Sequence, residues 1–276
     1  MSRISSEELT AFLETLGMDE PLGMAYVDVP PEEASHPANC PLPTRTEEAA
    51  GTVDWRRIWG EWSCVFRHLH ATRRKGQPAW FGPSNYGCLG AAFYLGWQPE
   101  QLEAIVRYVS MGGHGMPGER YADSPDTLRE MFRQTAPRPA PRPYAVFRRL
   151  SDFTREEPEV VVFFGRPECI AGLHQLAVFA TGDLHVVASP FGAGCANMVT
   201  WPLHFKERGQ QRAVLGGWDI SVRKYMGVDE ITFSLTTELF ERMLGCWRDS
   251  FLTTHQWAQV AVKRRRSREA WAREKA

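Results

Sequence analysis

The sequence predicts a mixed α/β fold in which a central mixed sheet contains a β-α-β unit, with an N-terminal helical part and C-terminal helices around it. Two observations predict this. Five segments of the second half are rich in β-branched residues and bounded by turns, namely 144–150, 159–165, 184–189, 212–217 and 230–235. Residues 166–182, between the second and third of these, have the apolar spacing of a helix. Strand, helix and strand within about 30 residues form a β-α-β unit.

The segment 159–165, EVVVFFG, has no alternation of polar and apolar residues. We therefore expect a central strand that is covered on both faces. The helix after it places Ile170, Leu173, Leu176 and Phe179 on one stripe. The end of the chain, 237–245 and 250–273, is predicted to be helical, and these C-terminal helices are where we expect a homodimer contact.

Composition excludes several classes of protein. Hydrophobic residues make up 43% of the 276 residues and charged residues 24%, which excludes collagen-like and wholly disordered chains. With 33 acidic and 32 basic residues the net charge is −1, which argues against a nucleic-acid binder or a protein of anionic membranes. The start of the chain lacks the apolar core of a secretory signal, and the longest apolar runs fall short of the roughly 20 residues of a membrane helix. We therefore expect a cytoplasmic protein with reduced thiols.

The first half is predicted to be mainly helical. A serine cap at Ser5 or Ser6 begins a helix that reaches Leu16 and is stopped by Gly17. Residues 24–29 alternate as a strand does. Residues 30–52 have little apolar periodicity, which predicts a long surface loop, and Asp54 caps a tryptophan-rich helix through Leu69.

Further along, helices are expected from Pro99 to Tyr108 and after Ser124. The inward face of the second comprises Leu128, Met131 and Phe132. The proline-rich residues 136–143 can be neither helix nor central strand, which makes them a stiff connector. We expect a single domain over 1–276, with a helical part (1–135) and a sheet-containing part (144–276) as its subdomains.

Two of the six cysteines lie in glycine-lined turns before predicted helices. Cys88 stands in YGCLGAA, and Cys195 stands in FGAGCAN after a strand end. Glycines allow close approach of a bound group, and amides at a helix start favour anions, so we expect a lowered thiol pKa at both positions. The alternative for each is a buried thiol with no special role. A third cysteine, Cys64, lies one turn before His68, a spacing that suits half of a metal site or an ordinary solvated histidine.

The glycine-rich loop 111–121 is a candidate lid. His114 and Glu119 lie in it, and both residue types transfer protons once positioned, so they are our candidate catalytic residues. A surface turn without a role is the alternative. The basic run 263–268 lies on a terminal helix among glutamates, which favours a solvated face over nucleic-acid binding.

Several of these segments resemble one family. EVVVFFGRPECIAGLHQL, SPFGAGCANMVTWPL, AVLGGWDISVRKYMGVDEITFSL and DSFLTTHQW are similar to the uncharacterised prokaryotic proteins catalogued as domain of unknown function 169, or ArCR. Cys64, Gly76 and the segment YGCLGAAFYLGW match the family in the first half. The resemblance implies a cytoplasmic protein and supplies no reaction. The cysteines at family motif positions are Cys64, Cys88 and Cys195.

The first hypothesis is that these three cysteines converge on a metal centre. Three thiolates favour an iron–sulfur cluster, or else zinc, over hard cations. A four-iron cluster on three thiolates leaves one iron open to a substrate as a Lewis acid. Zinc needs a fourth ligand, for which His68, His114 and Asp219 are candidates.

The second hypothesis is a metal-free protein that binds or senses a small molecule in an aromatic-lined pocket. The ten tryptophans suit a planar or apolar ligand. Asp219 and Arg223 are spaced to pair on one helical turn, or Arg223 holds a carboxylate of the ligand, with Gly192 and Gly194 beside it. A third hypothesis, a hydrolase with Cys195 or Cys88 as nucleophile and His114 as base, lacks an identifiable further partner.

Overall fold

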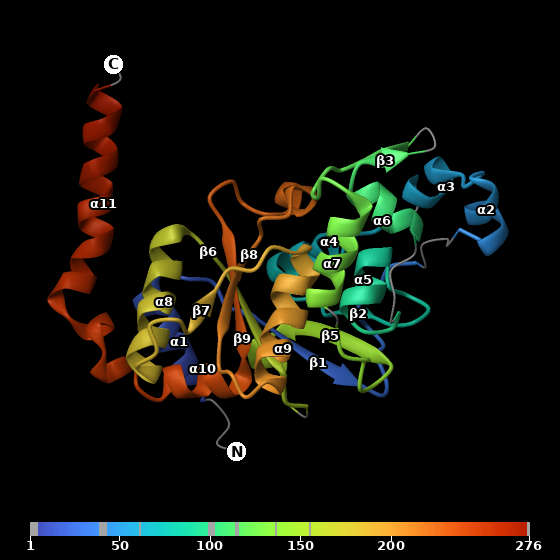
Figure 1. Cartoon of the computed structure of the whole chain (residues 1–276). Helices are drawn as coiled ribbons and strands as arrows, with labels where there is room; N and C mark the ends of the chain where they lie inside the picture. The colour runs from blue at the N-terminus through green and yellow to red at the C-terminus, as the bar shows by residue number, and fades with distance from the viewer. Residues whose placement is uncertain are drawn as a thin grey trace.

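A seven-stranded mixed sheet forms the centre of the protein, in the order β2-β5-β1-β6-β9-β8-β7 (Figure 1). The computed structural model describes residues 5–38, 43–60, 62–98, 103–113, 116–135, 137–154 and 156–274. Neighbouring strands are antiparallel, except that β7 and β8 are parallel. The strands are β1 (Leu22–Val27), β2 (Ala79–Phe81), β5 (Tyr144–Arg149), β6 (Val160–Gly165), β7 (Val187–Ala188), β8 (Ala213–Gly216) and β9 (Ile231–Thr236).

The predicted β-α-β unit is present, although its strands are not neighbours. Strand β6 leads through α8 (Pro167–Thr181) to β7. The two strands run parallel, with β9 and β8 between them in the sheet. The predicted apolar stripe of α8 is wrong at Phe179, whose side chain is 48% exposed. The buried face continues from Leu173 to Ala177 instead.

Helices cover both faces of the sheet, and β6 shows how the core is divided. Val161 and Phe163 point into one hydrophobic cluster, whereas Val160, Val162 and Phe164 point into the other. The first cluster is closed by α1 (Ser6–Leu16), α8 and α10 (Thr237–Leu244), and the second by α4 (Val65–Lys75), α5 (Leu89–Tyr94), the π-helical turn η2 (Ala196–Thr200) and α9 (Trp201–Glu207). All six residues of β6 are buried, which confirms the predicted central strand.

The beginning of the chain folds as its capping signals predict. The Ser5 side chain accepts a hydrogen bond from the amide of Glu8, and Gly17 ends α1 at φ 67°, in the left-handed region. The predicted loop 30–52 is corrected in part, because it contains α2 (Arg45–Ala50), whose capping box joins Thr44 and Glu47.

The prediction of a single tryptophan-rich helix is wrong. The segment forms two helices, α3 (Trp55–Gly60) and α4, because the backbone is extended at Cys64, just before α4. Cys64, at φ −62° and ψ 140°, is the N-cap residue of α4 rather than a residue inside a longer helix.

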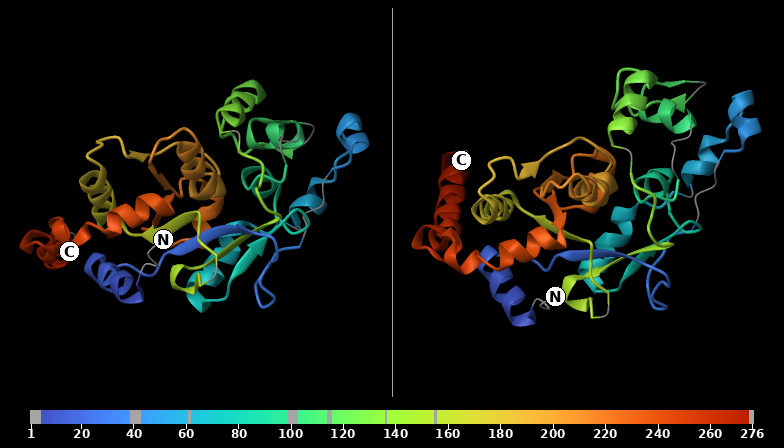
Figure 2. Two further views of the ribbon diagram at one scale, coloured as in Figure 1. Left: turned by 90° about the horizontal axis from the view of Figure 1, so that it is seen from below. Right: turned by 60° about the horizontal axis from the view of Figure 1, so that its bottom comes forward.

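A separate group of elements stands over the second face of the sheet. It comprises α6 (Glu103–Val109), the two-stranded hairpin of β3 (Gly112–Gly113) and β4 (Met116–Pro117), and α7 (Pro125–Gln134). In both views of Figure 2 this group, in green, lies at the opposite end of the molecule from the red C-terminal helix. The remaining elements are short 3₁₀ turns: η1 (Leu150–Asp152), η3 (Ile220–Tyr225), η4 (Trp247–Asp249) and η5 (Phe251–Thr253).

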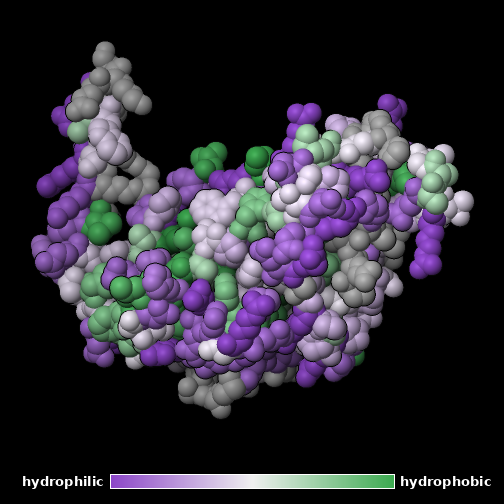
Figure 3. Space-filling view, in the orientation of Figure 1, coloured by the Kyte–Doolittle hydropathy of each residue, from purple (hydrophilic) through white to green (hydrophobic). Residues whose placement is uncertain are grey.

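The C-terminal helix α11 (His255–Glu274) stands clear of the body as an arm (Figure 1). Its first turn is anchored by Trp257, whose Nε1 donates to the carbonyl of Thr15 at 2.8 Å. Lys263, Arg265 and Arg266 are exposed, and the outer edge of the arm is hydrophilic in Figure 3. Within the described ranges, no helix has both the length and the apolarity to cross a lipid bilayer.

Glu8 ties the first helix to the chain near its end. Its carboxylate accepts hydrogen bonds from Arg248 Nη2 at 2.8 Å and from Trp247 Nε1 at 2.5 Å. The hydrogen bonds from Arg248 and then Trp247 lower the pKa of this carboxyl below its ordinary 4.5.

We expect Glu8→Gln to destabilise the protein at neutral pH and to do so less as the solution is acidified. A lowered pKa stabilises the folded state above the unfolded pKa, and that contribution is lost as the pH falls through the folded value. Urea unfolding of both proteins from about pH 7 to about pH 3 measures the difference. Glu7→Gln, one residue away, is the matched control. A stability gap that stays constant with pH contradicts the assignment.

Candidate functional site

A cavity of about 410 Å³ lies between the second face of the sheet and the α6–α7 group. This volume falls in the range of small-molecule and cofactor sites. Three segments form its floor, and the helices α6 and α7 form its roof. Floor residues include Cys64, Phe66, Cys88, Tyr94, Gly194 and Cys195, and roof residues include Ile105, Tyr108, Leu128, Met131 and Phe132.

Cys64 is placed by the start of α4. The two residues after it, Val65 and Phe66, are buried in the core on the second face of the sheet. Phe66 packs edge-on against Phe164 of β6, with ring centroids 6.0 Å apart. The thiol therefore projects into the cavity from a backbone that the core holds in position.

Cys88 is the N-cap residue of the short helix α5. Its Sγ accepts a hydrogen bond from the amide of Ala91 at 3.4 Å. The other end of α5 is tied down by two buried bonds, from the Tyr26 hydroxyl to the Leu95 carbonyl at 3.0 Å and from the Thr200 hydroxyl to the Tyr94 carbonyl at 2.8 Å. Both ends of the helix that carries this cysteine are therefore anchored.

Cys195 enters the cavity from the loop before η2. Gly194 precedes it and packs directly on Phe66, where a Cβ would lie 2.4 Å from Phe66 Cε2. Only glycine lets this loop approach α4 so closely. Cys195 is 7% exposed, and its own backbone leads into the buried π-helical turn.

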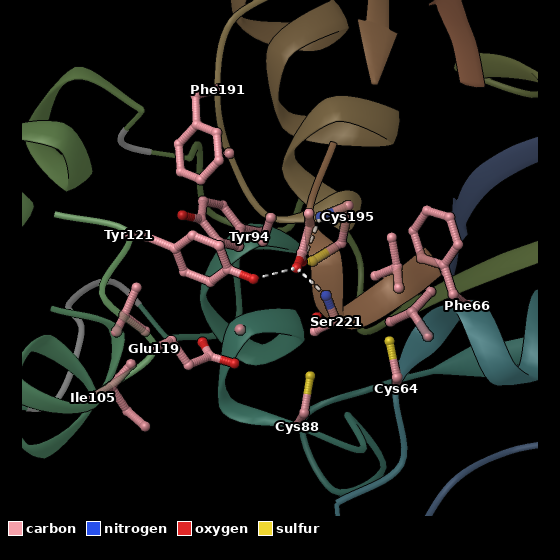
Figure 4. Close-up of a pocket in the computed structure, with 18 of the residues that line it drawn as sticks. Cys64, Phe66, Cys88, Tyr94, Ile105, Glu119, Tyr121, Phe191, Cys195 and Ser221 are labelled. Atoms are coloured by element: carbon pink, nitrogen blue, oxygen red, sulfur yellow. Dashed lines mark hydrogen bonds between the residues drawn. The ribbon is translucent and has the colours of Figure 1, made fainter. Parts of the chain in front are cut away.

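The sulfur atoms of Cys64, Cys88 and Cys195 face the same space from three separate segments (Figure 4). Burial and then the neighbouring Cys88 raise the pKa of Cys64 to about 12. Burial, followed by Cys88, Cys64 and Asp219, raises the pKa of Cys195 well above its ordinary value. The expected lowering at Cys195 is therefore wrong: loss of water outweighs the nearby amides.

Asp219 is the buried carboxylate of the cavity. One oxygen accepts from the amide of Ser221 at 2.9 Å and from the Tyr121 hydroxyl at 3.2 Å. The other accepts from the amide of Gly194 at 3.3 Å. These bonds join η3, the segment after β4 and the Cys195 loop; the donors Tyr121 and Ser221 are labelled in Figure 4. Asp219 therefore holds the wall together.

Glu119 lies on the roof side, in the segment after β4, and also lines the cavity. Burial raises the pKa of its carboxyl; a hydrogen bond with Tyr108 opposes this rise and the charge of Asp219 adds to it. Lys224 is the one cation among the described residues that line the cavity. The cavity thus combines two carboxyl groups and three thiols with one positive charge.

The structure places the other candidates as follows. Gly192 and Gly194 line the cavity, whereas His114 lies outside the described residues. Arg223 does not pair with Asp219, because its guanidinium donates to the carbonyls of Glu230 at 2.6 Å and Gly227 at 3.1 Å. These bonds tie η3 to the backbone that follows it, at residues 227 and 230.

His68 also lies away from the cavity. Its ring nitrogens hydrogen-bond the hydroxyls of Ser35 at 2.9 Å and Ser63 at 2.8 Å. Cys169 bonds the Gly17 carbonyl and Cys246 the Met243 carbonyl, so neither belongs to the trio. Cys40 lies outside the described residues.

Sequence reasoning missed much of the cavity wall. Trp62, Tyr108, Tyr121 and Phe191 line it, and no spacing in the sequence marks them apart from other aromatic residues. Leu128, Met131 and Phe132 were expected to form the inward face of their helix. They do point into the molecule, where they line the cavity. The available signal for the cavity was this narrow apolar stripe on a short helix that follows a glycine-rich loop.

A mononuclear metal site is not preformed. In the part of the chain that the structure describes, no three His, Cys, Asp or Glu side chains are grouped to hold one metal ion. Zinc–sulfur bonds of about 2.3 Å require thiolates within about 4 Å of one another. The three thiols share a cavity without forming such a set.

A family model described as uncharacterised ArCR, domain of unknown function 169, matches residues 13–245. The match includes all three cavity cysteines and both cavity carboxylates. No curated protein and no solved structure is significantly similar to the chain.

Proposed function

The chain belongs to the uncharacterised ArCR family, domain of unknown function 169, and we propose that it binds an iron–sulfur cluster through Cys64, Cys88 and Cys195. The observation that carries the proposal is that three thiols from distant segments line one cavity. Thiolates are the ligands that iron–sulfur clusters take. In a four-iron cluster each thiolate would bind a different iron atom, which requires a wider spacing of the sulfur atoms than one zinc ion does.

The charges around the cavity support a cationic occupant over an anionic one. Glu119 and the three thiols add negative charge to that of Asp219 once they lose their protons, and Lys224 alone opposes them among the described lining residues. Buried charges of one sign are stabilised by a bound cation, while iron supplies positive charge at the sulfur atoms themselves. The largely apolar roof limits the access of solvent to the site, which is one of the factors that set the potential of a cluster.

Three thiolates leave one iron of a four-iron cluster without a protein ligand. A cluster held by these cysteines would share the cavity with Tyr108, Tyr121 and Phe132, whose side chains suit a small organic molecule, and an open iron would supply a Lewis acid. Glu119 lies on the same wall and is the residue that we propose to exchange a proton with this molecule.

Anaerobic purification of the full chain tests the proposal. We expect a brown protein with broad visible absorbance that bleaches on reduction, and about four iron and four acid-labile sulfide per chain. Reconstitution with ferrous iron and sulfide restores the same content in a chain purified in air. A colourless chain that neither holds nor takes up iron, with unchanged thermal stability, overturns the proposal.

A metal-free ligand-binding protein is the second candidate, favoured by the aromatic wall and by the lack of a closed set of metal ligands in the described chain. Cys64, Cys88 and Cys195 are then small packing residues. The two candidates differ in the alkylation of these thiols by iodoacetamide. If they are ligands, all three are protected in protein treated with ferrous iron and sulfide relative to untreated protein, whereas a packing role predicts equal alkylation rates with and without the treatment.

A further inference from the structure

A second hollow, of about 720 Å³, lies beside the cavity and shares Lys224 and Tyr225 with it. Basic side chains from α4, the end of β5 and η3 line this hollow. We call it the basic groove, defined by His70, Arg73, Arg74, Arg149 and Lys224. No motif of the sequence singles it out, because its members lie up to 154 positions apart, from His70 to Lys224.

One pair of charges in the basic groove is already satisfied. Arg73 donates to both carboxylate oxygens of Glu230, at 2.6 and 3.1 Å, and its guanidinium lies 4.1 Å from the centre of the Phe164 ring. A bidentate pair that is stacked on an aromatic ring is fixed in position. It forms a rigid wall and contributes no net charge.

The other cations have no such partner. Arg149 donates one nitrogen to the Arg73 carbonyl at 3.3 Å, and Lys224 lies 5.2 Å from the centre of the Tyr225 ring. Neither of these nor Arg74 forms an ion pair with a carboxylate of the described chain. Besides Glu230, the acids that line the groove are Asp19 and Glu20, and Glu20 accepts a hydrogen bond from the amide of Ser151 at 2.7 Å. The groove therefore has three cations without an ion-pair partner in the described chain, Arg74, Arg149 and Lys224, against two acids outside the Arg73–Glu230 pair.

We propose that the basic groove binds the anionic group, a phosphate or a carboxylate, of a small ligand. The forked guanidinium groups of Arg74 and Arg149 match the paired oxygens of either group, and Lys224 adds a point charge. Because Lys224 and Tyr225 also line the cavity, the rest of the same molecule extends past them toward the aromatic chamber. This last step rests on the proposed function, whereas anion binding in the groove does not.

The test uses inorganic phosphate and isothermal titration of the full chain at constant ionic strength. We expect saturable binding, weakened at least about tenfold in the double variant Arg74→Gln and Lys224→Gln, since both side chains are exposed and their loss leaves the core intact. Arg67→Gln, also exposed on α4 but outside the groove, removes one positive charge from the same helix and should bind as the natural chain does. Absence of saturable binding, or equal binding by the double variant, overturns the proposal.

Two further titrations distinguish the anionic group. Phenyl phosphate and benzoate carry the same ring on a phosphate and on a carboxylate. The compound that the natural chain binds more tightly identifies the anionic group, provided that the double variant does not show this preference. If neither binds, the proposal fails. The readout does not involve iron, so a colourless chain that binds phosphate overturns only the proposed function. An iron-loaded chain without phosphate binding overturns only the groove.

Discussion

Replacing Cys88 by serine is expected to reduce bound iron and sulfide to background while the protein stays folded. The natural Sγ of Cys88 accepts the amide of Ala91 at the start of α5. Serine is among the preferred residues at such a position, so its hydroxyl keeps the cap. A hydroxyl oxygen is a hard ligand and a poor replacement for a thiolate on cluster iron.

The measurement is iron and sulfide content after anaerobic purification, with far-ultraviolet circular dichroism to show that the fold persists. Cys246→Ser is the matched control, because that thiol bonds the Met243 carbonyl and does not line the cavity. We expect it to retain the full iron content. A Cys88→Ser protein with as much iron as the Cys246→Ser protein would falsify the assignment of Cys88 as a ligand.

Capping signals and apolar runs made the local structure predictable from the sequence. Ser5 and Gly17 delimit α1 because both act on neighbouring backbone groups. The continuous apolar run of β6 indicates burial on both faces for the same local reason. The choice of Cys64, Cys88 and Cys195 as one group came from the family resemblance and the glycine-lined turns, and the structure brings their side chains to one cavity.

Properties that depend on distant segments could not be predicted. Strand β1 pairs with β5, more than 100 residues later, and no local pattern specifies that register. The pKa of Cys195 is a second case, because the sequence shows the helix start after it but not the burial that raises the value. The break between α3 and α4 is a third. The apolar spacing of the sequence runs on through the residues around Cys64 and gives no sign that one helix ends and another begins there.

The glycines of the Cys195 loop illustrate the same distinction between local freedom and distant contact. Sequence reasoning treated Gly192 and Gly194 alike, as residues that let a backbone approach a ligand. In the structure their surroundings differ. A Cβ on Gly192 would meet Ala196 Cβ at 3.2 Å, whereas one on Gly194 would meet three atoms of the Phe66 ring between 2.4 and 3.1 Å. Gly194 is therefore required for packing on α4, and Gly192 is not.

Gly194→Ala is accordingly expected to destabilise the protein by about 1–3 kcal/mol, the usual range for overpacking a core. The Phe66 ring cannot swing aside, since it is 2% exposed and is held against Phe164. The loop must retreat instead, which lengthens the bond from the Gly194 amide to Asp219 and moves Cys195 away from the other two thiols. Urea unfolding measures the loss of stability, and iron content after anaerobic purification measures the displacement of the thiol.

Gly192→Ala is the control within the same loop, and we expect its stability to stay within about 1 kcal/mol of the natural chain. Its nearest neighbours leave room for a methyl group after shifts of a few tenths of an ångström. If the two alanine variants unfold at the same urea concentration, the contact between Gly194 and Phe66 does not position the Cys195 loop. If Gly194→Ala is destabilised yet binds iron fully, the loop is packed as described but Cys195 is not a ligand. Only the joint loss of stability and iron in this variant, with both retained in its neighbour, links the packing of α4 to the chemistry of the cavity.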